Sequence, residues 1–554
     1  MKFPARLRLP SATLAAALLV LAGCASAPPA PPATAGPARP KLVVMIVIDG
    51  FPQRQLTDYR DQLGPDGFAR FLDRGAWFAD AHYGYGFTVT AAGHAVLLTG
   101  AYPHRTGIIG NEWRDRATGE LRYCTQDAAY TYIGHRTAKL DGTSPRNLRV
   151  ETVGDVLRRA DARSKVIAIS GKDRGAILPA GHAGTAYMYM KQTGLFASST
   201  YYMKAHPAWV DAFNAAKPAD RFFKAAWTPL LPEMAYARSV PDGQPWFAKG
   251  GRLPRVLGEG QDSPGPLFYD DLNRSPFLDA MTLDFARAAM AGEDLGTDDA
   301  PDILSVSLSG HDIVNHSWGA ESRLSHDHVL QLDNLLAAFF RDLDRRYGPE
   351  GYVALLTADH GFMPAPEHSK AQGRDAGRQS ASQAIARVNA GLAPRFGEGA
   401  WVRHFSAQAV QFDPKLLAEK KPDLAALAAE TKALLAREPG FAAAYTRAEI
   451  LGTAPADAPY LALVRKAFHA DLSGDVQAVL RPHWMFASSS SAATHGSPHP
   501  YDTHVPIAFY GPAWVKAGRR DGRVDVSDIA PTIARLLAIP APAASEGRPL
   551  PLAP

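Results

Sequence analysis

The stretch KLVVMIVIDG spans residues 41–50. Its first eight residues form an almost unbroken apolar run, and Asp49 and Gly50 end it. A short run of this kind is typical of a strand that is buried on both faces, as in a parallel sheet. We therefore expect residues 41–48 to form a strand at the centre of such a sheet.

Similar apolar runs recur along the chain, with helical patterns between them. The further runs are residues 165–170, 302–309, 352–358 and 505–510. Amphipathic or helically spaced stretches are residues 153–159, 278–290, 329–347 and 528–537, the last with Pro531 in its first turn. Strands that alternate with helices predict an α/β fold, a doubly wound and mainly parallel sheet flanked by helices.

Two stretches fit this alternation poorly. Residues 187–276 are rich in aromatic and turn residues, and residues 372–483 contain helical pieces such as 423–435. We expect both to be insertions that form a cap over the sheet. The catalytic domain would then extend over residues 41–554.

The composition is that of an ordinary globular protein. The 554 residues are 46% hydrophobic and 21% charged, which argues against disorder and collagen-like repeats. A net charge of +4 is small for this length and gives no reason to propose a nucleic-acid partner. The length is compatible with several domains or with one large α/β domain that carries insertions.

The N-terminus has the pattern of an export signal. Lys2, Arg6 and Arg8 precede an apolar segment, residues 12–21, that is too short to span a bilayer comfortably. The next residues, Leu21-Ala22-Gly23-Cys24, resemble a bacterial lipobox. The resemblance implies that residues 1–24 are a lipoprotein signal peptide with its lipobox, and that Cys24 is lipidated and becomes the mature N-terminus. The alternative is a plain secretory signal with a chance cysteine.

The segment after the lipobox predicts a tether. Residues 25–40 are rich in Pro and Ala, which is typical of a disordered linker between an anchor and a domain. Ala25, and no aspartate, follows the cysteine, which by resemblance to sorting rules favours the outer membrane and a periplasmic location. Cys124 is the only other cysteine, so no disulfide framework is expected.

Acidic and imidazole side chains gather at the ends of the predicted strands. They are Asp49, Asp312, His316, Asp359, His360 and His495. Singly, each has an ordinary explanation, since an aspartate at a strand end more often caps a helix. Together they lie where ligands collect in open α/β sheets, and burying them is costly unless they are paired or coordinated. Carboxylate oxygens and imidazole nitrogens are good zinc ligands, so the pattern predicts a metal centre.

A candidate nucleophile lies between the first two predicted strands, in the stretch GFTVTAAGHA, residues 86–95. A hydroxyl at a helix N-terminus beside a divalent cation is activated twice, because the metal lowers its pKa and the helix dipole favours the alkoxide. Phosphate would bind against the same helix terminus. The alternative is a threonine that only caps the helix.

These motifs resemble the alkaline phosphatase superfamily, which includes nucleotide pyrophosphatase/phosphodiesterases. The similarity is greatest to the branch of single-chain bacterial alkaline phosphatases with a threonine nucleophile, and it extends from Val43 to about Leu537. The motifs that carry it are Val47-Ile48-Asp49, Thr90 with Gly93-His94 and Thr99-Gly100, Gly107-Ile108-Ile109-Gly110-Asn111, Asp312 to His316, Thr357-Ala358-Asp359-His360-Gly361 and Thr494-His495-Gly496.

The resemblance implies a role for each matching residue. Thr90, and not Thr88, would be the nucleophile and would form a phosphothreonine. One zinc would be bound by Asp312, His316 and His495. The other would be bound by Asp49, Asp359 and His360. His504 competes with His495 as the last ligand, and the Thr-His-Gly context favours His495. Manganese or cobalt would also suit such oxygen and nitrogen ligands.

The segment SGKDRG, residues 170–175, bears on the substrate. A phosphate monoester carries more charge and more free oxygens than a diester, so a monoesterase needs added cations and donors. Lys172 and Arg174 match the Lys-x-Arg pair of the monoesterase branch, and Asn111 matches its phosphate-binding asparagine. The alternative is two solvated loop cations.

The sequence therefore predicts a monomeric alkaline phosphatase that hydrolyses small phosphate monoesters with two zinc ions. A phosphodiesterase or nucleotide pyrophosphatase is the alternative, and Lys172 and Arg174 argue against it. The complete ligand set argues against a non-catalytic surface lipoprotein, and Thr90 against a sulfatase. We expect His94 to pack or hydrogen-bond behind the nucleophile. His326 and His328 are expected at the surface or around the ligands.

Overall fold

The computed structural model describes residues 39–553. At its centre lies a sheet with the strand order β20-β2-β19-β12-β1-β11-β6-β7-β8. Strand β1 (Leu42–Ile48) pairs in parallel with β11 (Asp302–Leu308) on one side and with β12 (Val353–Thr357) on the other. Every residue of these three strands is buried, as the continuous apolar runs predicted.

The sheet continues in parallel on one side and reverses on the other. Strands β6 (Val166–Ser170) and β7 (Thr185–Met190) extend it in parallel from β11. On the far side of β12, strand β19 (Ile507–Tyr510) runs antiparallel to β12. Ile507, the first residue of β19, therefore faces Thr357, the last residue of β12. The C-terminal end of β12 therefore lies beside the N-terminal end of β19. A residue just after β12 and a residue just before β19 come close together there.

The outer strands are short. Strand β2 (Ala76–Phe78) pairs with β19, and β20 (Gly518–Arg520) pairs with β2. At the opposite edge, β8 (Leu195–Ala197) turns back antiparallel to β7. The sheet is thus mainly parallel, with reversed strands away from its centre.

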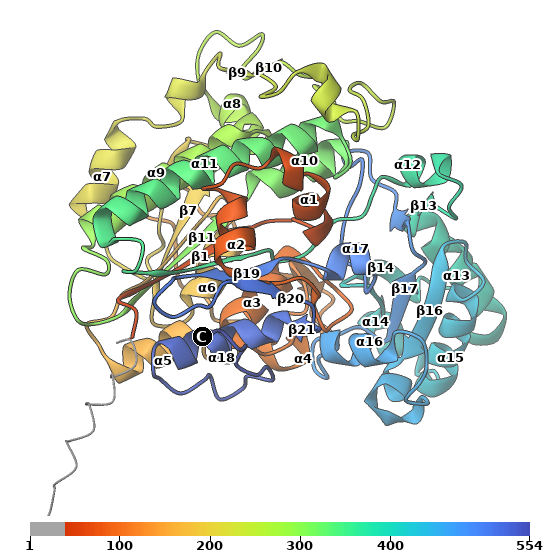
Figure 1. Ribbon diagram of the computed structural model, residues 1–554. Coiled ribbons are helices and arrows are strands. Elements are labelled where there is room, and N and C mark those ends of the chain that lie inside the picture. The colour runs from red at the N-terminus through yellow and green to blue at the C-terminus, as the bar shows by residue number, and fades with distance from the viewer. Residues whose placement is uncertain (1–38, 554) are drawn as a thin grey trace, which may run out of the picture. The chain divides into compact units, whose positions relative to one another are not determined.

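Helices cover both faces of this sheet (Figure 1). One face carries α1 (Gln53–Asp58), α2 (Phe68–Arg74), α9 (Pro276–Gly292), α10 (Gly310–Trp318) and α11 (Arg323–Tyr347). The other carries α3 (Thr90–Thr99), α5 (Val153–Ala160), α6 (Asp173–Ala180) and α18 (Ile529–Leu536). The prediction of a doubly wound α/β fold is confirmed.

Local sequence signals start several of these helices. Thr152 and Asp155 form a reciprocal capping box at the N-terminus of α5. Ser275 caps α9, whose first residue is proline, and Ser322 caps α11. These side chains satisfy backbone N–H groups that the first helical turn leaves without partners.

The boundary predicted for the first insertion differs from the structure. Strands β7 and β8 belong to the central sheet, although the aromatic-rich sequence from residue 187 onward was assigned to a cap. The side chains of β7 are almost all buried, because Tyr187 and Phe196 pack against Phe285 of α9. Residues 198–275 then leave the sheet and form α7 (Ala208–Ala215), the pair β9 (Ala226–Trp227) and β10 (Arg255–Val256), and α8 (Pro266–Asp271).

The second stretch builds a lobe with a sheet of its own, seen at the right of Figure 1. Its strand order is β14-β15-β17-β16, formed by β14 (Val402–Ser406), β15 (Ala409–Phe412), β17 (Val476–Leu480) and β16 (Phe441–Thr446). Helices α13 (Ala381–Phe396) and α15 (Leu424–Leu435) pack with it around a separate core that includes Trp401 and Leu427. At its base, β13 (Gly377–Gln379) pairs with β18 (Trp484–Phe486). We call residues 377–486 the lobe.

The predicted signal peptide, the lipobox with Cys24 and nearly all of the tether lie outside the described residues. Within residues 39–553, no helix is both long and apolar enough to cross a bilayer. Cys124 is buried and forms no disulfide in this part of the chain.

Candidate metal centre

Asp49 begins the centre at the carboxyl end of β1. Its backbone N–H donates to the carbonyl of Leu308, which holds it beside β11. Gly50 follows with a φ of +69°, and its N–H donates to Asp359 Oδ1 at 3.0 Å. A Cβ on Gly50 would lie only 3.0 to 3.1 Å from atoms of Asp312. Glycine at this position therefore allows the three aspartates to approach one another.

Asp312 and His316 lie one helical turn apart on α10, which directly follows β11. Residues spaced by four share a helix face, and here His316 Nε2 lies 3.5 Å from Asp312 Oδ1. The side chain of Asp312 is 2% exposed, whereas that of His316 is 25% exposed. His316 thus lies at the solvent-facing side of the cluster.

Asp359 and His360 follow β12, and His495 approaches them from the segment before β19. The rings of His360 and His495 stack at 3.5 Å with an angle of 11°. This convergence depends on the reversed direction of β19, which brings its N-terminal approach to the edge where β12 ends.

Backbone carbonyls orient the three imidazoles. The Nδ1 atoms of His316, His360 and His495 lie 2.9 to 3.0 Å from the carbonyl oxygens of Ala493, Gly361 and Thr88. A proton on each Nδ1, donated to its carbonyl, leaves each Nε2 with a lone pair. Burial lowers the pKa of both His360 and His495, which favours their neutral form. This is the arrangement found around metal-binding imidazoles.

The potential ligand atoms form two overlapping groups, each with all its atoms within 4.8 Å of one another. One group is Asp49, Asp359 and His360, and the other is Asp312, His360 and His495. The first matches the predicted ligand set of one zinc. In the second, His360 takes a place beside Asp312 and His495, while His316 lies just outside. His360 thus lies between two neighbouring groups.

The charges in this cluster fit divalent cations. Burial and the nearby Asp359 carboxylate raise the pKa of Asp49 well above its usual value. Among the described residues, Asp49 Oδ1 and Asp312 Oδ1 are buried without a hydrogen-bond partner. Buried acceptors of this kind are costly unless a cation or donor meets them. The donor set of carboxylate oxygens and imidazole nitrogens suits zinc.

Lys172 lies directly at this cluster. Its Nζ is 2.8 Å from Asp49 Oδ2 and 2.6 Å from Asp312 Oδ2, so it joins carboxylates of both groups. Burial lowers the pKa of Lys172, but Asp312 and Asp49 outweigh this effect and raise the net pKa. The ammonium group is therefore retained as a fixed positive charge at the centre.

Arg174 lies two residues further along the chain, in the first turn of α6. Its Nη1 donates to the hydroxyl of Tyr123 at 3.2 Å. Lys172 and Arg174 line a cavity of about 500 Å³ together with Tyr123 and Ser309. Both predicted substrate-binding cations thus face one cavity beside the carboxylates, and neither is a solvated loop residue.

Thr90 is the first residue of α3, and its Oγ1 lies 3.5 Å from His360 Nε2. The neighbouring N–H of Ala91 donates to Asn111 Oδ1 at 2.9 Å, which places Asn111 at the same helix terminus. Thr88 is fully buried and its hydroxyl donates to the carbonyl of Ser497. Of the two threonines, Thr90 is the one beside the metal-ligand cluster.

His94 has a closer relation to the centre than the sequence indicated. Its Nδ1 lies 2.9 Å from the Thr90 carbonyl and 3.2 Å from Asp359 Oδ2, and its Nε2 lies 2.8 Å from Ser307 Oγ. It therefore hydrogen-bonds behind the nucleophile, as expected, and also contacts a predicted ligand. Its position four residues after Thr90, on the same helix face, was the available signal.

A second set of buried polar residues connects α10 to α1, α9 and α11. His311 lies 2.8 Å from Gln55 Oε1 through Nε2 and 3.1 Å from His328 through Nδ1. His328 Nε2 in turn lies 3.0 Å from Asp279 Oδ2. No motif in the sequence singles out His311 or Asp279. Of the two positions expected for His326 and His328, the surface is wrong, since both side chains are fully buried. His328 instead contacts His311, the residue before Asp312.

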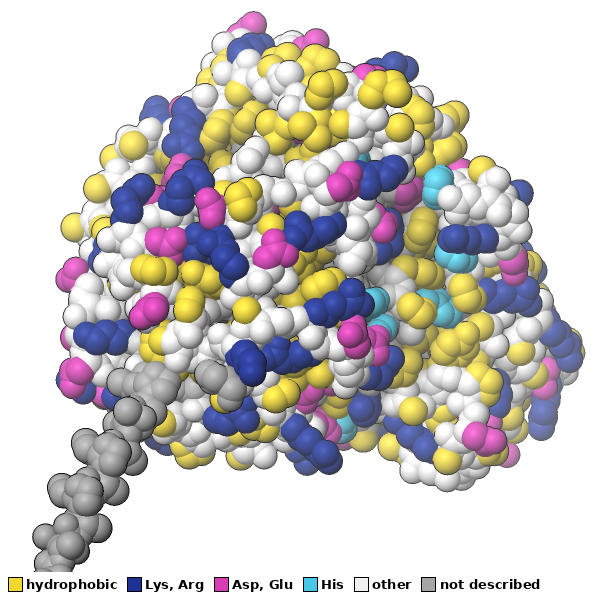
Figure 2. Space-filling view, viewed as in Figure 1, with side chains coloured by type: hydrophobic (Ala, Val, Ile, Leu, Met, Phe, Trp, Pro, Cys, Tyr) yellow, Lys and Arg dark blue, Asp and Glu magenta, His cyan; other side chains and the backbone are white. Residues whose placement is uncertain are grey.

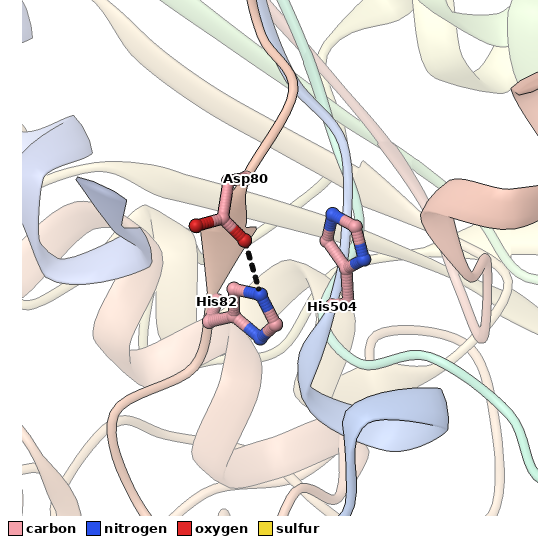
Figure 3. Close-up of side chains that lie close together, drawn as sticks. All are labelled: Asp80, His82 and His504. Atoms are coloured by element: carbon pink, nitrogen blue, oxygen red, sulfur yellow. Dashed lines mark hydrogen bonds and ion pairs between the residues drawn. The ribbon is translucent and has the colours of Figure 1, made fainter. Parts of the chain in front are cut away.

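His504, the alternative to His495, lies in a different cluster with Asp80 and His82 (Figure 3). Its Nε2 lies 2.8 Å from the carbonyl of Ala79, and its ring stacks on that of His82. His82 is held in turn by Asp80 and by Thr503. These contacts join the segment after β2 to the segment before β19, which gives the cluster a structural role.

Comparison with known proteins agrees with this architecture. Residues 43–502 match the family model described as type I phosphodiesterase / nucleotide pyrophosphatase. The chain belongs to this family, within the alkaline phosphatase superfamily. It is 34% identical to alkaline phosphatase PafA of Elizabethkingia meningoseptica, over 92% of this chain and 94% of that protein. It is 35% identical to alkaline phosphatase PhoV of Synechococcus elongatus, over 92% of each chain.

Solved structures of relatives have the same fold as this chain. The crystal structure of wild-type alkaline phosphatase PafA matches with a TM-score of 0.86 and 33% identity, over 93% of this chain and 99% of that one. A mutant of PafA with substitutions of a threonine, an asparagine, a lysine and an arginine matches with a TM-score of 0.85. Murine ectonucleotide pyrophosphatase / phosphodiesterase 5 in complex with AMP, at 12% identity and a TM-score of 0.51, shares the fold.

Helix α3 packs closely against Asp359, just after β12, and this contact can be tested by a substitution at Gly93. A Cβ on Gly93 would lie 2.0 Å from the carbonyl oxygen of Asp359, so Gly93→Ala must push Thr90 and Asp359 apart. We expect a loss of about 1–3 kcal/mol in unfolding free energy and a marked fall in metal affinity and activity. Urea unfolding and metal titration measure these effects.

Gly265→Ala is the matched control, because a Cβ there would meet nothing within 4 Å. It should change stability by less than about 0.5 kcal/mol. Equal stability and equal metal affinity of the two variants would contradict the packing described for α3.

Proposed function

We propose that this protein is an alkaline phosphatase that hydrolyses phosphate monoesters through a phosphothreonine on Thr90. The observation that carries the proposal is the placement of the Thr90 hydroxyl, at the N-terminus of α3, against a buried cluster of three carboxylates and three imidazoles. The fixed positive charge of Lys172 lies in the same cluster.

The relatives support this proposal by their names. PafA and PhoV are alkaline phosphatases, and each matches this chain over nearly its whole length. PhoK of Sphingomonas, 31% identical over 91% of this chain, is also an alkaline phosphatase. The residue types substituted in the PafA mutant are those of Thr90, Asn111, Lys172 and Arg174, in the same order along the chain.

The chain's own residues have distinct parts in this reaction. Thr90 supplies the oxygen that attacks phosphorus, and the positive end of the α3 dipole favours the developing negative charge on that oxygen. Asn111, fixed by the N–H of Ala91, offers its amide N–H groups to a phosphate oxygen. His94 holds the Thr90 carbonyl and Asp359 in place. As the bond from Thr90 to phosphorus forms, the bond from phosphorus to the ester oxygen breaks and the alcohol leaves. Water then takes the phosphoryl group from Thr90, which releases phosphate and restores the hydroxyl.

We propose two zinc ions as the cofactors. One would be held by Asp49, Asp359 and His360, and the other by Asp312, His316 and His495. When bound, such ions lower the pKa of the attacking hydroxyl or water and stabilise negative charge on the attacking and leaving oxygens. His360 belongs to the first set and also lies within 4.8 Å of the ligand atoms of Asp312 and His495 in the second, which supports a dinuclear rather than a single site.

The preference for monoesters rests on Lys172 and Arg174. Both cations line the cavity beside the cluster, where the additional charge of a monoester would lie. The family description names phosphodiesterases and nucleotide pyrophosphatases, and these remain the alternative activity. A diester carries less negative charge than a monoester and has an additional substituent. The two partly buried cations therefore stabilise a bound diester less than a bound monoester.

We also propose that the protein is a monomeric lipoprotein, anchored through Cys24 to the outer membrane and facing the periplasm. The basic, apolar and lipobox segments of residues 1–24 support this location, and the Pro/Ala-rich residues 25–40 are long enough to act as a tether. The substrates would be small phosphate monoesters, with no nucleic-acid partner.

Removal of metal should abolish activity. Dialysis against a chelator should leave inactive protein, and zinc should restore turnover at about two metal ions per chain. His495→Ala should reduce the bound metal to about one ion, whereas His504→Ala, in the separate cluster, should keep about two. Elemental analysis makes both measurements. Clearly less than two metals in fully active protein would refute the dinuclear proposal.

Loss of both cations should narrow the preference for monoesters. Lys172→Ala with Arg174→Ala should lower kcat/KM for an aryl monoester by about 30- to 1,000-fold, because charge-assisted contacts in the transition state are lost. Turnover of the corresponding diester should fall much less. Thr90→Ala should remove both activities.

Two controls separate substrate binding from metal binding. The metal content of the double variant must be measured, because Lys172 contacts Asp49 and Asp312. Lys191→Ala removes a cation from the same cavity without touching the cluster and should leave the preference unchanged. An equal loss of monoester and diester turnover, at full metal content, would show that the pair is structural.

The anchor is tested by Cys24→Ser. The described domain begins at residue 39, so the variant should be released as a soluble protein with full activity. Mass spectrometry of the membrane-extracted wild type should show lipid on Cys24. An unmodified Cys24 at the mature N-terminus would refute the lipoprotein proposal.

A further inference from the structure

A cavity of about 450 Å³ lies between the metal centre and the lobe. One wall carries Asn111, His316 and His495 of the α/β body. The opposite wall comes from the lobe and includes Phe405 and Phe486. Figure 2 shows histidine and hydrophobic side chains meeting in the hollow where the lobe, at the right, adjoins the rest of the molecule.

The lobe wall is aromatic. Phe405 of β14 lies 4.9 Å from Phe486 of β18 and 5.9 Å from Phe441 of β16, measured between ring centroids. Phe405 and Phe486 are only partly buried, so part of each ring faces the cavity. These rings are about 80 residues apart in sequence, since Phe405 lies on β14 of the four-stranded lobe sheet and Phe486 on β18, which pairs with β13 at the base of the lobe.

A further ring continues the apolar surface on the body side. Phe87, just before α3, is partly exposed and packs against Gly110 and Gly496. A Cβ at either glycine would lie 3.1 to 3.2 Å from its ring. Phe87 therefore has a fixed position between the loop that carries Asn111 and the His495 segment. Apolar rings thus flank the route from the metal centre to the lobe.

The position of the cavity relative to Thr90 identifies which part of a substrate it meets. In-line displacement places the attacking and leaving oxygens on opposite sides of phosphorus. Thr90 begins α3, and Gly93 and His94 of this helix pack directly against Asp359. The Thr90 hydroxyl therefore lies on the side of Asp359, which groups with Asp49. The leaving oxygen would then point toward Asp312, His316 and His495, and the last two of these line the cavity.

The charge of the cavity restricts the leaving group further. Of the described residues that line it, none is Lys or Arg, and Asp502 is the one carboxylate. A phosphate or pyrophosphate leaving group needs cations or several N–H donors around it. An aromatic or other flat apolar group instead gains by leaving water and stacking on exposed rings.

We propose that this cavity is a leaving-group subsite, and that it selects phosphate monoesters whose alcohol carries an aromatic or flat apolar group. The inference rests on the proposed phosphatase function and specifies its substrate class. It also assigns a role to the lobe, which supplies one wall of the subsite through Phe405 and Phe486.

The test compares two esters whose alcohols have similar acidity, ethyl phosphate and 2-phenylethyl phosphate. Differences in their hydrolysis then report binding of the phenyl ring and not leaving-group chemistry. The wild type should favour the phenyl ester in kcat/KM by about tenfold or more, the size expected for burying a ring against apolar side chains. 2-Phenylethanol should also inhibit competitively, and ethanol should not.

Phe405→Ala with Phe486→Ala should remove most of this preference and the inhibition by 2-phenylethanol. Turnover of ethyl phosphate and inhibition by inorganic phosphate should change less than about twofold, since the metal centre is untouched. Phe396→Ala is the matched control, because Phe396 packs on the same lobe core but does not line the cavity.

If the double variant fails to fold, Phe405→Leu replaces it. Leucine keeps apolar volume but removes the ring, and the preference must then fall by about threefold or more. An unchanged preference, or an equal loss for both esters, would overturn the subsite. Failure of the wild type to hydrolyse either ester would instead contradict the proposed function, and the subsite with it.

Discussion

Three carboxylates buried together at one edge of a sheet are the constraint on which the rest of this structure depends. Asp49, Asp312 and Asp359 are at most 2% exposed, and like charges cannot be buried side by side without compensation. Lys172 supplies one positive charge. The imidazoles of His316, His360 and His495 bond to backbone carbonyls through Nδ1 and direct the Nε2 atoms toward the cluster. Metal binding would complete the compensation, so the free energy of metal binding would also be free energy of folding.

The direction of a single strand decides how the ligands meet. If β19 ran parallel to β12, its N-terminal approach would lie at the opposite edge of the sheet, and His495 would be far from His360. Because β19 is reversed, the segment that carries His495 arrives where β12 ends. The neighbouring cluster of Asp80, His82 and His504 holds the same segment to the segment after β2. The fold thus keeps the ligand-bearing segments rigid.

The α/β body and the lobe contribute different parts of the site. The α/β body holds Thr90 and the proposed metal ligands, the groups that we propose act on phosphorus. The lobe contributes no predicted ligand, but its rings form the far wall of the cavity beside His316 and His495. An inserted lobe can therefore change which ester is accepted while the reacting groups stay in place.

The sequence alone determined the central strands and the helices between them, and it indicated the residues that we expect at the site. Continuous apolar runs and motifs such as Thr-Ala-Asp-His-Gly are local patterns, which neighbouring residues are sufficient to specify. The tertiary structure decided that His360 lies between two ligand groups, that His94 contacts Asp359, and that β7 and β8 join the sheet. It also decided the pairing of Phe405 with Phe486. These are contacts between distant segments, and they depend on strand order and direction, which no local pattern encodes.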